Sequence, residues 1–266
     1  MRRLFAFLLS LIAAPVAAQS EIELTEVDVE LFLAVDVSRS MSPYELEIQR
    51  KGYAAAMASE EVKGTIAGGM IGRIAVTYVE WAGAHSQTVI VPWTLIETPE
   101  QADDVARRLV DYFNQGMRRT SISEALVYAA ESFETNEFNG LRRVIDVSGD
   151  GPNNQGRPVL AARSEVLNRG IVINGLPLMT QDEFSLRWGI PDLDIYYREC
   201  VIGGPGSFMI PVKTWDQFAE AVRRKLVLEI AGLPQTEMPG IYRVEGYNCQ
   251  VGEEIWQRNQ QQFFTP

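Results

Sequence analysis

The stretch LAVDVSRSMSPYE, from Leu33 to Glu45, joins an apolar run to the start of a helix. The near-continuous apolar residues from Val29 to Val35 are typical of a strand that is buried on both faces. Ser42-Pro43-Tyr44-Glu45 predicts a capping box with proline at the first helical position. An acid, Asp36, therefore stands where a buried strand ends, and serines follow it at alternate positions.

Predicted strands and helices alternate along the rest of the chain. Further strands are expected at Ile74–Ala82, Thr88–Val91, Arg143–Val147 and Ile171–Leu176. Further helices are expected to begin at Thr98, Ser121, about Pro158 and Thr214. The alternation predicts an α/β fold, with a doubly wound and mostly parallel sheet flanked by helices. A short turn between the second and third strands suggests a hairpin, which gives one antiparallel edge strand.

Oxygen-bearing side chains gather where these strands end. Ligands of open α/β sheets bind at the carboxyl ends of the strands, near a switch in strand order. Asp36, Ser38 and Ser40 alternate in an extended turn, so their oxygens can face one point. Hard cations such as Mg²⁺ prefer oxygen ligands. One carboxylate and two hydroxyls are too few for a firm site, and Thr120 and Asp150 are the candidates for the remaining ligands.

Each segment also has a structural explanation. Ser42 and Ser121 can cap helices, and Asp150 can be a turn acid between glycines. Because Ser42 suffices as a cap, Ser38 and Ser40 remain unexplained by capping. The coincidence of three such segments at corresponding strand ends favours a metal site.

These segments carry a family resemblance. Asp36-x-Ser38-x-Ser40, Thr120 to Leu126 and Asp150-Gly151 resemble the three segments of a von Willebrand factor A (VWA) domain, over about Val27 to Ile230. The resemblance implies a metal-ion-dependent adhesion site in which Ser38, Ser40 and Thr120 approach the metal through hydroxyls. Asp36 and Asp150 would act directly or through water. A position is left open for an acidic group from a protein partner.

The stretch RRVIDVSGDGPNNQG carries a closer resemblance to secreted proteobacterial VWA-like proteins of unknown function. It also departs from the usual family pattern, since Ser148-Gly149-Asp150-Gly151 stands where Thr-Asp-Gly is usual. We expect Asp150 to face the metal because the flanking glycines free the loop. We expect Asp146, within the strand, to pair with an arginine. The segment 180–206 is longer and more polar than a plain strand connection.

The ends of the chain predict its compartment and its division into domains. Residues 1–18 resemble a signal peptide, with a basic start, an apolar stretch and small residues before Gln19. That stretch is shorter than the roughly 20 residues that span a bilayer, so we expect no stable membrane anchor after cleavage. The protein is therefore expected to be periplasmic or secreted. A VWA-like domain is expected at 27–232, followed by a tail at 233–266 that is docked or partly disordered.

The net charge of −11 excludes general affinity for nucleic acid or for anionic membrane surfaces. Cys200 and Cys249 allow one disulfide in an oxidising compartment. Their spacing does not show that they meet, and two buried thiols are equally compatible with the sequence.

Three functions compete. The first is a binding module, not an enzyme, that engages a protein partner through Mg²⁺ (or Mn²⁺ or Ca²⁺). The second is a phosphoesterase of the haloacid dehalogenase type, since SGDGPNN resembles one of its motifs. That chemistry needs an acid two residues after the nucleophile, where this chain has Ser38, and a last acid where it has Asn154. The third is a structural domain whose metal site is vestigial.

Overall fold

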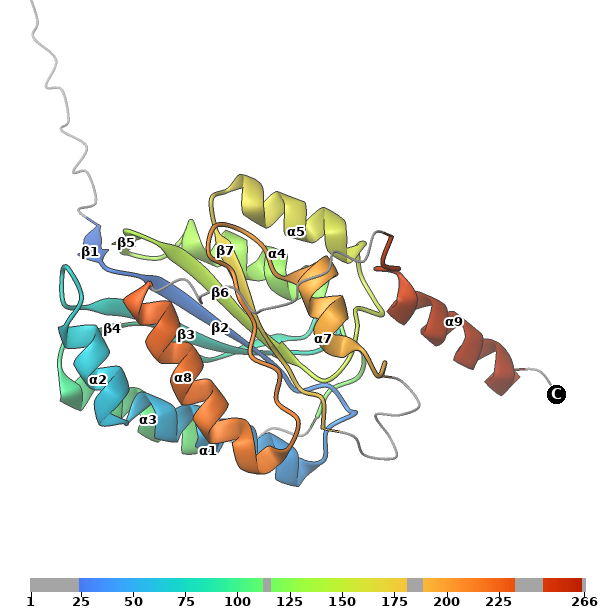
Figure 1. The fold of residues 1–266 in the computed structure, drawn as a ribbon, viewed down its shortest axis with the longest axis horizontal. Coiled ribbons are helices and arrows are strands. Elements are labelled where there is room, and N and C mark those ends of the chain that lie inside the picture. The colour runs from blue at the N-terminus through green and yellow to red at the C-terminus, as the bar shows by residue number, and fades with distance from the viewer. Residues whose placement is uncertain (1–23, 112–115, 181–188, 233–245, 265–266) are drawn as a thin grey trace, which may run out of the picture.

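A computed structural model describes residues 24–111, 116–180, 189–232 and 246–264 (Figure 1). Its centre is a five-stranded sheet in the order β4-β3-β2-β6-β7. The strands are β2 (Glu30–Asp36), β3 (Ile74–Trp81), β4 (Gln87–Ile96), β6 (Arg143–Gly149) and β7 (Val172–Pro177). All neighbours are parallel except β3 and β4, so β4 is an antiparallel edge strand. The predicted fold class is confirmed. A separate parallel pair, β1 (Thr25–Val27) and β5 (Phe138–Gly140), was not predicted.

Helices cover both faces of the sheet (Figure 1). One layer contains α1 (Pro43–Met57), α2 (Glu60–Ala67), α3 (Pro99–Val110) and α8 (Phe218–Ala231), which follows a 3₁₀ turn at Trp215–Gln217. The other contains α4 (Ile122–Phe133), α5 (Val159–Asn168) and α7 (Leu193–Tyr196), which runs into a π-helical turn at Tyr197–Val201.

The sheet has an apolar core on each of its two faces. Strand β2 contributes to both cores because successive side chains of a strand point to opposite faces. Leu31 and Leu33 pack with the α1 layer, whereas Phe32 and Ala34 pack with the α4 layer. Burying each such leucine or phenylalanine stabilises the fold by about 1.5–3 kcal/mol. The capping box predicted at Ser42 is present at the start of α1, and α3, whose start was predicted at Thr98, also begins with a capping box.

The strand order determines where a ligand can bind. From β2 the chain runs through β3 to the β4 edge, and it later returns to the other side of β2 as β6. The order therefore switches between β2 and β6, which is where open α/β sheets hold ligands. Asp36 is the last residue of β2, and Asp150 directly follows β6. The topology brings these two acids to the same edge of the sheet.

Asp146 of β6 lies in a buried ion cluster beneath α8. Its Oδ1 is 2.8 Å from Lys225 Nζ, and Lys225 also pairs with Glu229. The expected arginine partner was therefore wrong, because α8, far along the chain, presents a lysine to this strand. Burial raises the pKa of Glu229 to about 7, although the charge of Lys225 opposes that shift and the charge of Asp146 adds to it.

A disulfide joins Cys200, in the π-helical turn, to Cys249, across a sequence separation of 49 residues. It answers the question that cysteine spacing left open. Helix α9 (Val251–Phe264) begins two residues after Cys249 and extends away from the rest of the molecule in Figure 1. Its first turn contacts the loop after β6, where Asn153 Nδ2 donates to Glu253 Oε1 at 2.8 Å.

The expected signal peptide and residues 233–245 of the expected tail lie outside the described residues. Within the described ranges, every helix is too short or too polar to cross a bilayer.

Candidate metal centre

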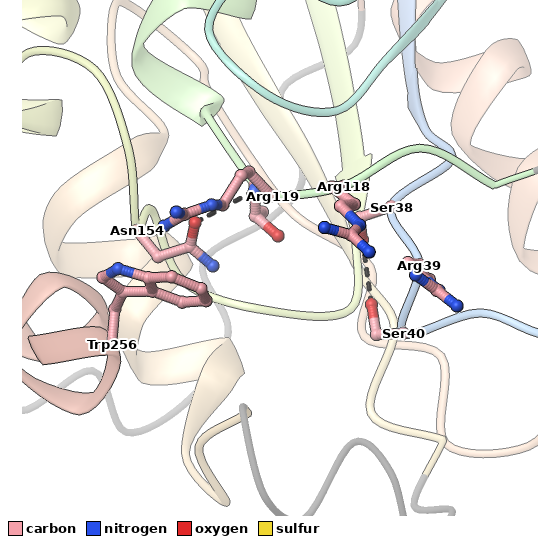
Figure 2. A pocket seen from close by; sticks show the side chains of 8 residues that line it. Ser38, Arg39, Ser40, Arg118, Arg119, Asn154 and Trp256 are labelled. Carbon is pink, nitrogen blue, oxygen red and sulfur yellow. Dashed lines mark hydrogen bonds between the residues drawn. The ribbon is translucent and has the colours of Figure 1, made fainter. Parts of the chain in front are cut away.

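The loop after β2 turns two serine hydroxyls toward each other. Asp36 is fully buried, and its Oδ1 accepts a hydrogen bond from the backbone N–H of Ser38 at 2.7 Å. Gln49 of α1 donates to the Asp36 carbonyl oxygen at 3.0 Å and so fixes the end of the strand. The Oγ atoms of Ser38 and Ser40 are 2.8 Å apart, as the dashed line in Figure 2 shows. The alternate spacing thus places both hydroxyls at one point.

The loop after β6 brings the second acid to these hydroxyls. Ser40 Oγ donates to Asp150 Oδ1 at 2.8 Å, and Ser38 Oγ lies 3.4 Å from the same oxygen. Asp150, and not Asp146, is therefore the acid of this segment that meets the serines. Gly149 is needed for this approach, because a Cβ there would lie 3.0 Å from Asp36 Oδ2 and 2.9 Å from the Tyr197 hydroxyl.

Thr120 is held at the site by the same loop. Its N–H donates to Asn154 Oδ1 at 3.0 Å, and the N–H of Asn154 donates to the Thr120 carbonyl at 2.8 Å. Ser121, as predicted, caps α4, so capping does not explain Thr120. Thr120, Ser40 and Asp150 line one small pocket. The structure therefore brings all five predicted residues to one edge of the sheet.

The electrostatics of this edge favour a cation. Burial raises the pKa of Asp36 well above its usual range, the nearby charge of Asp150 raises it further, and hydrogen bonds from Ser38 oppose the shift. Asp36 Oδ2 is buried and has no hydrogen-bond partner among the described residues. A buried carboxylate oxygen without a partner is costly unless a cation or a proton neutralises it.

The donor set fits a hard divalent ion. It consists of two carboxylates and three hydroxyls, which are the ligand types of Mg²⁺ and Ca²⁺. The described residues contain no group of three or more His, Cys, Asp and Glu side chains that could hold a metal. A metal at this edge would therefore depend on the hydroxyls as well as on the acids.

The serine side of the site opens into a pocket of about 270 Å³ (Figure 2). Its lining residues are Ser38, Arg39, Ser40, Arg118, Arg119, Thr120, Asn154 and Trp256. Sequence reasoning did not find the arginines or Trp256. Arg39 lies inside the quoted motif, whereas Trp256 lies on α9, which the disulfide and contacts with the loop after β6 hold near the site.

Comparison with known proteins supports the fold described above. A family model described as "Protein of unknown function (DUF1194)" matches residues 26–234. No curated protein matches the chain.

Solved structures that resemble the fold include proximal thread matrix protein 1 (PTMP1) from the mussel byssus, solved with a zinc-occupied MIDAS motif, where MIDAS denotes the metal-ion-dependent adhesion site. It shares 16% identity with a TM-score of 0.58, over 79% of this chain and 49% of that chain. The pilus adhesin SpaC from Lactobacillus rhamnosus GG shares 10% identity with a TM-score of 0.55, over 77% of this chain and 31% of that one. The chain thus spans about half the length of PTMP1 and less of SpaC. At these identities the likeness shows the fold, which is VWA-like.

Proposed function

The chain belongs to the DUF1194 family and has a VWA-like fold, and from that premise we propose that it is a binding module that engages a protein partner through a divalent cation. The observation that carries the proposal is the convergence of five oxygen-bearing side chains from three loops at the switch point between β2 and β6. PTMP1, which has a similar fold, was solved with a zinc-occupied MIDAS motif, and this supports a cation site in the present chain.

The ligands would be Asp36, Ser38, Ser40, Thr120 and Asp150. Two carboxylates offset the charge of a divalent ion without exceeding it, and the hydroxyls add no charge. A bound Mg²⁺ (or Mn²⁺ or Ca²⁺) would supply a positive centre for an acidic side chain of the partner, and this attraction strengthens as water leaves the contact. The low number of charged ligands predicts weak binding of the metal alone, with a Kd on the order of micromolar to millimolar.

The proposal assigns no catalytic role. In the phosphoesterase alternative, the residue two positions after Asp36 must be an acid that transfers a proton. Here it is Ser38, whose hydroxyl contacts Ser40 and Asp150. Asn154, where that motif has an acid, is hydrogen-bonded to the backbone of Thr120.

The proposal includes a periplasmic or secreted location, with the signal peptide at 1–18, the VWA-like domain at 27–232 and the tail at 233–266. The disulfide between Cys200 and Cys249 supports it, since such bonds persist in oxidising compartments.

Calorimetric titration with Mg²⁺ and Mn²⁺ tests the metal site. Asp36→Ala is expected to weaken binding at least about tenfold, because it removes half of the carboxylate charge. Thr120→Ala removes a neutral ligand and is expected to weaken binding less. Asp104→Ala on α3 removes an acid of equal charge outside the site and is the matched control. Equal metal binding by the wild-type protein and Asp36→Ala, with the fold of both verified by circular dichroism, would show that Asp36 is not a ligand.

A further inference from the structure

Two arginines stand side by side at the mouth of the site. Ser38 pairs with Met117 in a parallel β-bridge, and the Met117 N–H donates to the Val37 carbonyl oxygen at 2.9 Å. The residues that follow the paired positions are Arg39 and Arg118. Both line the same pocket, and Figure 2 draws both side chains on the Ser38–Ser40 side of it.

Both arginines are exposed, and neither forms an ion pair with an acid in the described part of the chain. Several other arginines of the described residues, among them Arg50, Arg157 and Arg223, form an ion pair with an acid of this acidic chain. The two guanidinium groups also lie near the hydroxyls of the candidate metal site, where their positive charge would repel a metal cation. The pair therefore points to an anion from outside the chain.

The opposite wall of the pocket is Arg119 stacked on Trp256. The Arg119 guanidinium carbon lies 3.3 Å from the centroid of the Trp256 ring (Figure 2). Burial, and then the charge of Arg118, lowers the pKa of Arg119. Arg119 has a φ of 78°, and among the described residues it is the only non-glycine with positive φ. Such a conformation is strained for a residue that has a Cβ, and strained residues of this kind gather at ligand sites.

We propose that this pocket is a second anion position, so that the partner is an acidic protein segment with two carboxylates. One carboxylate would bind the cation, and the other would receive hydrogen bonds from Arg39 and Arg118. The inference rests on the proposed function and specifies the partner of that site. The planar guanidinium group matches the geometry of a carboxylate.

Fluorescence anisotropy with synthetic peptides tests the inference. The probes are labelled nonapeptides with one glutamate, or with two glutamates separated by zero to three neutral residues, in Mg²⁺ or in EDTA. The best two-glutamate peptide is expected to bind the wild-type protein about tenfold tighter than the one-glutamate peptide, because it adds charge-assisted hydrogen bonds. Arg39→Gln with Arg118→Gln is expected to remove that advantage. Arg224→Gln, an exposed arginine on α8 outside the pocket, is the matched control and is expected to keep it.

Calorimetry with Mg²⁺ tests the metal site separately from the second anion position. The double arginine variant is expected to bind Mg²⁺ at least as tightly as the wild type, because two nearby positive charges have been removed. No preference for two glutamates in the wild type, or the same preference in the double variant, would overturn the inference and leave the metal site standing. Tighter binding of a peptide whose second glutamate is phosphoserine would overturn the choice of carboxylate. If Mg²⁺ does not bind the wild-type protein at all, the proposed function fails, and the inference fails with it.

Discussion

The disulfide between Cys200 and Cys249 is expected to be the main restraint on helix α9. Replacing both residues by alanine opens a loop with a sequence separation of 49 residues. In the chain-entropy account, this costs about 4 kcal/mol of the free energy of unfolding, less any strain in the native bond. Other contacts of this region include Asn153 to Glu253 at 2.8 Å, the Tyr247 hydroxyl to Asp192 at 3.0 Å, and Arg119 on Trp256. Each of these polar contacts contributes roughly 1 kcal/mol, which is less than the loop-closure contribution of the disulfide.

Two measurements are needed, because removing the disulfide can destabilise the whole fold or only release α9. Urea denaturation gives the change in the free energy of unfolding. Hydrogen exchange of the amides of α9, together with fluorescence of Trp256, reports whether the helix leaves the pocket. We expect a loss of about 3–4 kcal/mol in the double variant and fast exchange throughout α9.

Gly252→Ala tests the packing of α9 against the loop after β6 while the disulfide stays intact. A Cβ at this position would lie 2.1 Å from the Asn153 carbonyl oxygen, a backbone atom that no side-chain rotation can move. Alanine favours a helix over glycine by about 1 kcal/mol, so a change in Trp256 fluorescence and faster exchange in this variant would reflect lost docking and not lost helix propensity. A double cysteine variant that loses under about 1 kcal/mol, with α9 as protected as in the wild type, would refute the reasoning.

Two further predictions concern pH and processing. Because the pKa of Glu229 is raised from 4.5 to about 7, the folded protein keeps a proton that the unfolded chain has released, so this group's contribution to stability is lost as pH rises between those values. Urea denaturation should show a decline of about 3 kcal/mol over that range in the wild type and a clearly smaller one in Glu229→Gln, whereas equal declines would contradict the assignment. The mature protein should begin near Gln19, and mass spectrometry of protein purified from its native compartment should find residues 1–18 removed; a retained Met1 in a membrane fraction would contradict it.

The sequence predicted the central strands because each is a short apolar run with its own boundaries, whereas the edge strand β4 was predicted to end at Val91 and runs on to Ile96. Strand β2 contributes all of its residues to the buried interior, so its pattern could not be mistaken for a surface helix. The acids at the switch point followed from topology, since the carboxyl ends of neighbouring parallel strands meet at one edge.

Features that depend on contacts between distant segments could not be predicted in this way. Asp146 was assigned an arginine because its neighbours in sequence are arginines, but Lys225 reaches it from α8. Helix α9 was missed because it is rich in glutamine and has no continuous apolar face to signal its period. The arginine pocket depends on the bridge between Ser38 and Met117 and on the stacking of Arg119 against Trp256, and neither leaves a local pattern.

Arg119 links the pocket to α9, because it has a left-handed backbone conformation and its side chain stacks on Trp256 of that helix. Binding in the pocket and docking of α9 are therefore expected to be coupled. Arg119 directly precedes Thr120, whose hydroxyl is one of the proposed metal ligands. The stacking of Arg119 on Trp256 therefore helps to fix the backbone that positions this hydroxyl. A ligand that binds more tightly when α9 is docked must, by thermodynamic linkage, strengthen the docking of α9 by the same factor. The protection of α9 against hydrogen exchange would then report occupancy of the site from more than a hundred residues away in sequence, even though none of the proposed metal ligands lies on that helix.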